Sequence, residues 1–324
     1  MGDLHPKKVR HQAIVLFRRS YRVSMSQIAE WLGVSRTALY KSRHRFERDG
    51  QLAQTVITFV DKERGINKKI GGVKLHLTFN GDYPRIKIGR DQFLTILREH
   101  GRLFRKKRIH KKNKPQDYAG RQDVAHQLAV AGPGHLWVHD DTEVTTLDGK
   151  AHLALSTDAY SSRVVGYSWS KRADTQHVKK ALEMALEGHV PGDVQLIHHS
   201  DNGSIYASKA YQALLSTHMQ PSWSPPGRPD RNPIAERINQ TFKDEYLCDA
   251  AHKTFEQLEQ DFAIYISHYN ERRPHMSCDY GTPAQVHAGL VEPIKRWKQR
   301  PKTYPTSKAS EGKKKPVEPN NKKC

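Results

Sequence analysis

The stretch Leu136-Trp137-Val138-His139-Asp140-Asp141-Thr142 places two carboxylates inside an apolar segment that favours a β-strand. Side chains alternate between the two faces of a strand, so Asp140 shares a face with Val138 and Asp141 points the other way. A buried strand rarely carries an aspartate without a functional or pairing cause. Asp140 is therefore the first candidate site residue, and the pattern leaves Asp141 open as the alternative.

Strand-forming residues continue on both sides of this stretch. Residues 135–146, 151–158 and 163–170 are rich in Val, Leu, Thr, Tyr and Trp, and the dipeptides Asp148-Gly149 and Ser161-Ser162 between them are typical of turns. These features predict a three-stranded antiparallel meander.

Helices and strands are expected to alternate after the meander. The predicted elements are a helix from the cap Asp174 to about residue 187, a strand over 194–199, a helix over 204–217, a proline-rich loop at 221–229, and helices over 233–247 and 255–270. Three antiparallel strands followed by this alternation is the order of the ribonuclease-H-like fold. We therefore predict an α/β domain with a mixed five-stranded sheet over residues 131–290.

Two more carboxylates stand at the ends of predicted elements. Asp201 follows the strand 194–199, where ligands of open α/β sheets commonly lie, and Glu236 falls in the first turn of the next-but-one helix. Each acidic residue has a purely structural explanation: Asp201 could cap a helix, Glu236 could favour the helix dipole, and Asp140 could pair with an arginine. Their joint order of strand, strand end and helix in one domain favours a shared site.

Three carboxylates from separate elements suit phosphoryl transfer. This chemistry needs an activated oxygen nucleophile, a stabilised leaving oxygen and neutralised charge on phosphorus, which two divalent cations about 4 Å apart can supply. Hard cations prefer carboxylate oxygens, so Asp140, Asp201 and Glu236 are the predicted catalytic and metal-binding residues. Asn239 and Lys243 lie near the same helix face as Glu236 and are predicted to contact DNA, with a merely solvated lysine as the alternative.

Residues 25–46 have the pattern of a helix-turn-helix made of two short helices. Gly33 suits the left-handed conformation that ends the first helix, and Ser35 can cap the second. The candidate contacts to the DNA groove and phosphates are Ser35, Arg36, Thr37, Tyr40, Lys41 and Arg43. An ordinary helical hairpin would show the same apolar spacing, but the basic composition favours DNA binding.

The remaining segments complete a four-part organisation. Residues 67–80 are expected to be irregular, 90–98 a short amphipathic helix, and 105–114 a dense basic run that is either a linker along a DNA backbone or a solvated connector. The predicted domains are a helix-turn-helix domain over 1–50, a helical DNA-binding subdomain and basic linker over 51–130, the catalytic domain over 131–290, and a basic disordered tail over 291–324.

The net charge of +20 is unevenly distributed. Residues 1–130 carry 29 Lys and Arg against 11 Asp and Glu, residues 131–290 carry 14 against 20, and residues 291–324 carry 11 against 3. Basic flanks attract phosphate backbones through counterion release. An acidic centre suits an enzyme that holds cations against a phosphate substrate, although a solvated acidic surface would have the same composition.

Composition also argues against a membrane or secreted protein. No stretch approaches the roughly 18 uninterrupted apolar residues of a membrane span, and the first residues are charged. The three cysteines, Cys248, Cys278 and Cys324, form no paired motif for a structural zinc ion or a redox couple. We expect a cytoplasmic, nucleoid-associated protein without a membrane partner.

Several segments together resemble the DDE transposases of the IS-three insertion-sequence family, whose catalytic domain is similar to retroviral integrase. The matching segments are Trp137-Val138-x-Asp140, Asp158-Ala159-Tyr160-Ser161-x-Arg163-Val164-Val165-Gly166-Tyr167, His199-Ser200-Asp201-x-Gly203-Ser204-x-Tyr206-Ala207-Ser208, Asn232-Pro233-Ile234-Ala235-Glu236, Tyr269-Asn270-x-Arg272-Arg273-Pro274-His275 and Thr282-Pro283. The 34 residues between Asp201 and Glu236 are close to the family spacing. The resemblance covers residues 131–288 and extends through 88–101 to about residue 67.

The resemblance implies a transposase that binds the ends of its mobile element and catalyses metal-dependent DNA cleavage and strand transfer. Asp140, Asp201 and Glu236 would hold two Mg²⁺ or Mn²⁺ ions, and a homo-multimer would assemble on double-stranded DNA of the element ends and target. The chain departs from the family at Asp141, where an apolar residue or Thr is usual, at Asn202 in place of Arg, and in its fused helix-turn-helix. A non-catalytic regulator of transposition and a structure-selective nuclease of the same fold are the alternative functions.

Overall fold

A computed structural model describes residues 23–104, 123–190, 195–201, 203–225 and 231–294 of the chain. The predicted basic run at 105–114 and most of the predicted tail, from residue 295 on, lie outside these residues. None of the helices within the described ranges is long and apolar enough to cross a membrane.

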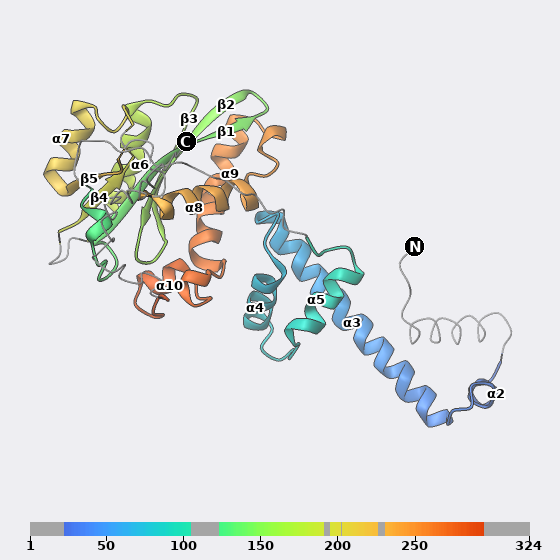
Figure 1. The fold of residues 1–324 in the computed structure, drawn as a ribbon. Coiled ribbons are helices and arrows are strands. Elements are labelled where there is room, and N and C mark those ends of the chain that lie inside the picture. The colour runs from blue at the N-terminus through green and yellow to red at the C-terminus, as the bar shows by residue number, and fades with distance from the viewer. Residues whose placement is uncertain (1–22, 105–122, 191–194, 202, 226–230, 295–324) are drawn as a thin grey trace, which may run out of the picture.

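The part of the chain from residue 123 to residue 294 is built around a mixed five-stranded sheet in the order β3-β2-β1-β4-β5 (Figure 1). Its strands are β1 (Leu136–Thr146), β2 (Gly149–Asp158), β3 (Val164–Ser170), β4 (Ile197–Ser200) and β5 (Gln220–Trp223). The first three strands pair antiparallel, while β4 is parallel to β1 and β5 is parallel to β4. The predicted meander and ribonuclease-H-like sheet are confirmed.

Strand β5 lies in a segment for which the sequence predicts only a proline-rich loop. Pro221 stands within this strand, paired with His198 of β4. Because β5 is the last strand of the sheet, one of its sides has no strand partner, and proline is tolerated on such an edge. Pro221 is therefore compatible with an edge strand, and the prediction of only a loop at this position is wrong.

Helices cover both faces of the sheet (Figure 1). On one face, α6 (Thr175–Glu187) and α7 (Lys209–His218) form an apolar core with Trp137 and Ala154 of the sheet. On the other face, α8 (Pro233–Thr241) and α9 (Phe255–Ser267) pack against Val144, Leu153 and Leu155. The period of two along the strands therefore assigns odd and even positions of β1 to different cores.

The contact between α6 and β3 is close enough to require a glycine. A Cβ atom on Gly166 would lie 2.1 Å from the carbonyl oxygen of Ala181 and 2.8 Å from the amide nitrogen of Ala185. Both of these are backbone atoms and cannot move aside as a flexible side chain could. Gly166 thus sets how near α6 lies to the sheet.

Two helices of the catalytic domain continue into π-helical turns. Helix α8 runs directly into η3 (Phe242–Tyr246), and α9 runs into η5 (His268–Arg272). The described residues also form η1 (Ala125–Gln127), η4 (Ala250–His252), η6 (Met276–Cys278) and α10 (Pro283–His287). The helix predicted over 204–217 begins later, at Lys209, because Ser208 accepts the N-cap hydrogen bond and residues 204–207 form turns.

The N-terminal part consists of α2 (Met25–Trp31), α3 (Arg36–Ile66), α4 (Gly72–Asp82) and α5 (Arg90–Glu99). Gly33 has a φ of +62° between α2 and α3, and Ser35 caps α3, both as predicted. The prediction of two short helices is wrong, since α3 has 31 residues and crosses the predicted domain boundary at residue 50. No proline interrupts α3, and its second half packs on α4 and α5.

Helix α4 replaces the irregular segment expected over 67–80. Leu75 and Phe79 lie four residues apart on one side of α4, and both are fully buried against Phe59 of α3 and Phe93 of α5. This packing outweighs the low helix propensity of the glycine and asparagine residues in the segment. Helix α5 matches the amphipathic helix predicted over 90–98.

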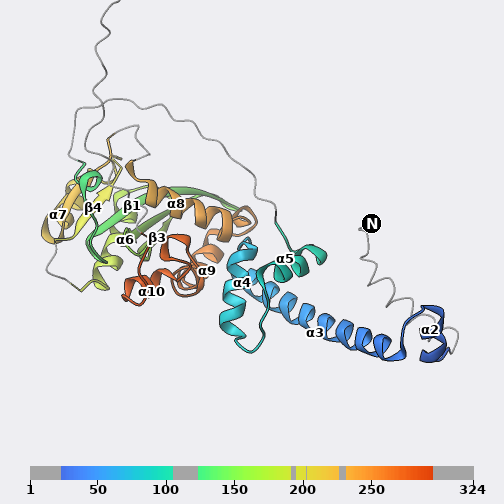
Figure 2. The ribbon, with the colours of Figure 1, turned by 60° about the horizontal axis from the view of Figure 1, so that its bottom comes forward.

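Helix α3 projects from the catalytic domain as one rod, with α2 at its far end (Figure 2). At a rise of 1.5 Å per residue its length is about 46 Å. Its near end is attached to the catalytic domain, where Ile66 packs against the core shared by the sheet, α8 and α9. The helix-turn-helix therefore lies far from the catalytic domain but on a helix that is anchored in it.

Candidate active site

Asp140 lies on β1, and Asp201 directly follows β4, the neighbouring parallel strand. The register pairs Val138 of β1 with His199 of β4, and two residues beyond this pair come Asp140 on β1 and Asp201 just after β4. Asp140 is half-buried and Asp201 is exposed. The edge of the sheet thus brings the first two predicted carboxylates together.

The pKa of Asp140 reflects this pairing. Burial, together with the charge of Asp201, raises the pKa of Asp140 to about 7, and a hydrogen bond from Asn239 partly opposes this effect. Two carboxylates repel one another when both are ionised, and a divalent cation between them would remove that repulsion. Asp140 and Asp201 offer only carboxylate oxygens as metal ligands. These ligands and the raised pKa of Asp140 fit a hard cation such as Mg²⁺.

Asn239, for which we predict a DNA contact, is hydrogen-bonded within the candidate site. Its side chain is 5% exposed, and its Nδ2 donates to Oδ2 of Asp140 at 2.8 Å. Asn232, at the start of α8, donates through Nδ2 to the carbonyl oxygen of His139 at 3.0 Å. Both asparagines hold α8 against β1. In the sequence, the only indication of this role is that Asn239 lies on the same helix face as Glu236.

Glu236 lies on α8, one helical turn before Asn239, and its side chain is exposed. Within the described residues, no three His, Cys, Asp or Glu side chains are grouped closely enough to hold a metal ion. The structure thus brings Asp140 and Asp201 together and places Glu236 on the helix that contacts Asp140 through Asn239, without completing a three-carboxylate cluster. Lys243 follows on η3 and is half-buried.

Asp201 does not cap a helix. Its Oδ1 accepts a hydrogen bond from the amide of Gly203 at 3.0 Å, within the turn after β4. The N-cap of α7 is Ser208 instead. The structural explanation of Asp201 as a helix cap is therefore wrong, and the carboxylate remains exposed at the sheet edge.

Asp141 points to the opposite face of the sheet, as the alternation on β1 predicts. One of its oxygens is 2.9 Å from Nδ1 of His152 on β2, and the other is 3.1 Å from Nε2 of His177 on α6. Nδ1 of His177 in turn contacts Oγ of Ser168 at 3.1 Å. These contacts engage Asp141 in a separate polar network and favour Asp140 as the first carboxylate of the site.

Buried histidines fill the sheet behind the carboxylates. His139 and His198 stack with ring centroids 3.9 Å apart, and burial lowers the pKa of His139 to about 3 and that of His198 well below its usual value. His199 contacts the hydroxyl groups of Ser222 and Ser224. These rings are neutral and hydrogen-bonded to side chains, so they add no positive charge beside Asp140 and Asp201.

The predicted DNA-contacting residues of the helix-turn-helix occupy the exposed start of α3. Oγ of Ser35 accepts from the amide of Ala38 at 3.1 Å, so this side chain caps the helix. Arg43 pairs with Glu47 at 2.8 Å, and both remain exposed. All six residues of this set are exposed: Ser35, Arg36, Thr37, Tyr40, Lys41 and Arg43.

Comparison with known protein families matches most of the described chain. Residues 130–229 match an integrase core domain, residues 217–283 match a second integrase core domain, and residues 5–55 match a homeodomain-like domain. The two core matches together cover the sheet and helices α6, α7, α8 and α9. They therefore span all three predicted carboxylates.

The curated proteins that match this chain include transposases of bacterial insertion sequences. The transposase for insertion sequence element IS904 of Lactococcus lactis is 31% identical over 202 residues, which cover 61% of this chain and 78% of the relative. A putative transposase for element IS986/IS6110 of Mycobacterium tuberculosis is 28% identical and covers 74% of this chain and 88% of its own. Transposase InsF for insertion sequence IS3A of Escherichia coli is 33% identical, with 48% and 54% covered.

Solved structures also match parts of this chain. A simian T-cell lymphotropic virus intasome in complex with the PP2A regulatory subunit B56 gamma matches 74% of this chain and 76% of its own, with 20% identity and a TM-score of 0.43. The HTLV-2 integrase catalytic core domain in complex with magnesium matches 48% of this chain and 97% of its own, with 21% identity and a TM-score of 0.38.

Proposed function

The chain belongs to the IS-three-type insertion-sequence transposases, DDE enzymes that cleave DNA and transfer strands with an integrase core domain, and we propose that Asp140, Asp201 and Glu236 form its active site. The observation that carries this assignment is the juxtaposition of Asp140 on β1 with Asp201, which directly follows the adjacent parallel strand β4. Asn239 adds to it, because its hydrogen bond to Asp140 draws the helix of Glu236 to the same edge of the sheet.

The side chains of this site have different roles: some would bind the metal ions, and others orient these ligands or contact the DNA. Asp140 and Asp201 are fixed by the sheet, and Asn239 orients Oδ2 of Asp140 by donating to it. Glu236 approaches from the adjoining helix, which the hydrogen bond of Asn232 to β1 holds in place. Lys243, two turns along the same helical segment, supplies a positive charge for a DNA phosphate.

Two Mg²⁺ or Mn²⁺ ions, when bound by these carboxylates, would neutralise charge on the scissile phosphodiester and on its attacking and leaving oxygens. A water oxygen attacks a phosphodiester at the element end, and the freed 3′-hydroxyl then attacks a phosphodiester of the target. Each attack forms one P–O bond and breaks another, so no side chain needs to become a covalent intermediate. Carboxylate ligands and a lysine are sufficient residue types for this reaction.

The partners follow from the remaining residues. The exposed side chains at the start of α3 would read the element end, and the basic segment 105–114 would add phosphate contacts. Two ends must be joined to one target, so we propose that a homo-multimer of this chain assembles on double-stranded DNA. Each copy of the chain would contribute one helix-turn-helix and one catalytic domain to the complex on DNA.

The test is an assay of purified protein with a labelled duplex that carries the DNA flanking its own coding region, in Mg²⁺ and in Mn²⁺. Asp201→Asn and Glu236→Gln should abolish cleavage and joining while DNA binding stays near the native level. Glu187→Gln alters an exposed carboxylate at the end of α6 and serves as the control that should cut normally.

Each outcome of this assay separates the proposed function from its alternatives. Joined products made by the native protein and not by the two variants support the assignment. Cutting by either variant would remove that residue from the site. Specific binding without cleavage in either metal would favour the regulator, and cleavage without joined product would favour the nuclease.

A further inference from the structure

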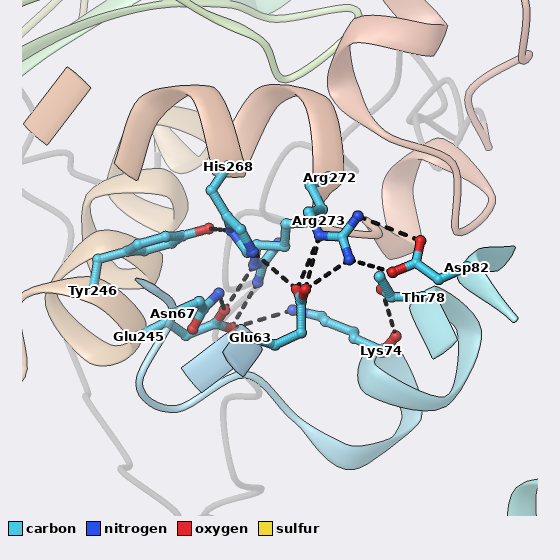
Figure 3. A network of polar contacts seen from close by, with 10 residues as sticks. All are labelled: Glu63, Asn67, Lys74, Thr78, Asp82, Glu245, Tyr246, His268, Arg272 and Arg273. Carbon is cyan, nitrogen blue, oxygen red and sulfur yellow. Dashed lines mark hydrogen bonds and ion pairs between the residues drawn. The ribbon is translucent and has the colours of Figure 1, made fainter. Parts of the chain in front are cut away.

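Two consecutive arginines help to attach the N-terminal arm, residues 23–104 with helices α2 to α5, to the catalytic domain. Arg272 ends the π-helical turn η5, and Arg273 follows it. Figure 3 shows the two side chains reaching different carboxylates, Arg272 to Glu63 of α3 and Arg273 to Glu245 of η3. Because each guanidinium presents a planar fork of donors, each pair fixes distance and orientation together.

Arg272 holds the end of α3. Its Nη2 donates to Oε1 of Glu63 at 2.7 Å, and its Nε donates to the same oxygen at 2.9 Å. Nη2 also reaches Oδ2 of Asp82, the last residue of α4, at 2.5 Å. Burial would raise the pKa of Glu63, which is 3% exposed, but the hydrogen bonds from His268 and Arg272 outweigh it and lower that pKa.

Arg273 holds the end of the active-site helix. Its Nε and Nη2 donate to the two carboxylate oxygens of Glu245, each at 2.7 Å. From the arm, Nδ2 of Asn67 donates to Glu245 at 2.9 Å and Nζ of Lys74 donates at 3.2 Å. Glu245 is thus shared between the catalytic domain and the arm, and it remains ionised because these donors lower its pKa to about 2 against the effect of burial.

One continuous helical segment links this anchor to the candidate active site. Helix α8 carries Glu236 and Asn239, and it runs without a break into η3, which carries Glu245. Asn239 touches Asp140 at one part of the segment, and Glu245 touches Asn67 and Lys74 at the other. The contacts of Glu245 with Asn67 and Lys74 therefore fix the position of α3 relative to α8, the helix that carries Glu236.

The length of α3 makes this attachment sensitive to small rotations. Arg36 and Glu63 are 27 residues apart on α3, which corresponds to about 40 Å at 1.5 Å per residue. A tilt of about 10° at Glu63 would move the recognition end by about 7 Å, or about two base pairs at 3.4 Å each. A loose attachment would let the helix-turn-helix contact DNA at several distances from the catalytic site.

We propose that Arg272, with Glu63 and Asp82, determines which phosphodiester is cut, by fixing the number of base pairs between the helix-turn-helix site and the active site. Arg273 and Glu245 join this clamp to the helix of Glu236. These are specificity-determining and positioning residues, since the contacts described above join them to one another and not to Asp140, Asp201 or Glu236. This inference rests on the proposed function of the active site.

The experiment maps cleavage positions on an end-labelled duplex at single-nucleotide resolution. The native protein should cut mainly at one phosphodiester, and Arg272→Gln should spread cleavage over neighbouring ones, lowering the share at the main position by about twofold or more for a displacement of about two base pairs. Arg102→Gln is the matched control, because Arg102 makes an equally bidentate contact to Asp61 on the same helix, but at an exposed site within the arm.

A second readout does not depend on cleavage. Spin labels placed by bioorthogonal chemistry at the exposed positions His44 and Glu187 report the distance between arm and catalytic domain. The distance distribution should widen in Arg272→Gln and Glu63→Gln and stay narrow in Arg102→Gln. Arg272→Lys, which keeps the charge but loses the planar fork, should give an intermediate width if Arg272→Gln proves too unstable to study.

The outcomes distinguish this inference from the proposed function. A native protein that never cuts refutes the proposed function. The spin-label distance distributions then still test whether Arg272, Glu63 and Asp82 hold the arm in place. Native cleavage already spread over several positions, or an Arg272→Gln protein with the native position and the native distance width, would overturn the inference.

Discussion

At the scale of single residues, Asp140 is costly to the metal-free protein. Its pKa is raised from 3.8 to about 7, so the folded state favours the protonated form and loses stability as the pH rises from about 4 to about 7. A difference of this size corresponds to at most about 4 kcal/mol once the carboxylate is ionised. The residue that we assign to catalysis thus weakens the fold in which it stands.

Asp140→Asn should therefore raise the melting temperature of the metal-free protein at pH 8 while abolishing DNA cleavage. At pH 4 the native and variant melting temperatures should nearly agree, because Asp140 is then protonated in the folded state. Added Mg²⁺ should raise the melting temperature of the native protein and leave the variant unchanged. A variant that melts below the native protein at pH 8 would contradict the raised pKa.

Asn239 provides a second test at this scale. Its hydrogen bond lowers the pKa of Asp140, so Asn239→Ala should raise that pKa and make protons compete better with Mg²⁺. Calorimetric titration with Mg²⁺ should show weaker binding than in the native protein, and the difference should grow toward pH 6, reaching at most about tenfold if the pKa of Asp140 rises by about one. Gln240→Ala, the next residue on α8, should bind as the native protein does, whereas equal pH profiles for all three proteins would exclude this role.

The sequence predicted single residues best where their environment is local. The alternation along β1 was enough to send Asp140 and Asp141 to opposite faces, because the period of a strand is independent of its neighbours. The partners of Asp141 could not be predicted, since His152 and His177 come from β2 and α6 and meet it only in the folded sheet. The hydrogen bond of Asn239 to Asp140 could not be predicted for the same reason, since it also joins two different elements.

At the scale of elements, the long helix α3 has one weak point. Gly50 lies in its middle, where glycine costs about 1 kcal/mol relative to alanine, and a Cβ there would meet nothing within 4 Å. Gly50→Ala should therefore stiffen the arm without a steric penalty. The amides around residue 50 should exchange with deuterium more slowly, by about fivefold for 1 kcal/mol.

Gly72→Ala is the matched comparison within the same part of the chain. A Cβ at Gly72 would lie 2.6 Å from Cδ2 of Leu94, so this change should instead disturb the packing of α4 on α5. It should speed exchange in α4 and leave the amides around residue 50 near their native rates. Faster exchange around residue 50 in Gly50→Ala would mean that the glycine is needed for the shape of α3.

Elements with regular, strongly patterned sequences were predicted closely, and those set by distant contacts were not. The meander, α6 and α5 follow from alternation, turn dipeptides and capping, all of which act over a few residues. Helix α4 depends on burying Leu75 and Phe79 against Phe59 and Phe93, and β5 on an open edge beside β4. Neither environment can be read from the segment itself, so glycine, asparagine and proline were given too much weight.

At the scale of the whole molecule, the charge distribution and the architecture agree. The strongly basic N-terminal 130 residues include an arm that carries the helix-turn-helix away from the catalytic domain, and the acidic centre contains the carboxylates of the candidate site. The contacts that join the arm to the catalytic domain were not part of the sequence-based prediction. Glu63, Glu245 and the two arginines are far apart in sequence, and their pairing appears only in the folded chain.

Glu245→Gln tests whether this joint makes the arm and the catalytic domain one cooperative unit. Since the pKa of Glu245 is lowered from 4.5 to about 2, its ionised form stabilises the folded protein above about pH 4.5, and this contribution is lost as the pH falls toward 2. The lowered pKa corresponds to about 3 kcal/mol at pH 7. The variant should lose about this much stability and show a flatter acid dependence between pH 4.5 and 2.

Urea unfolding at pH 7 provides the measurement, because helix content includes α2 to α5 of the arm, whereas the buried tryptophans Trp137, Trp169 and Trp223 all lie in the catalytic domain. In the native protein the arm holds Glu245 and packs Ile66 on the catalytic core, so the two signals should change in one transition. In Glu245→Gln the contacts of Asn67, Lys74 and Arg273 lose their shared charge, and the signals should separate into two transitions. Arg102→Gln leaves the contacts of Glu245 intact and should keep a single transition. Separate transitions in the native protein would contradict the prediction. They would show that the arm and the catalytic domain unfold independently and that ion pairs alone do not couple them.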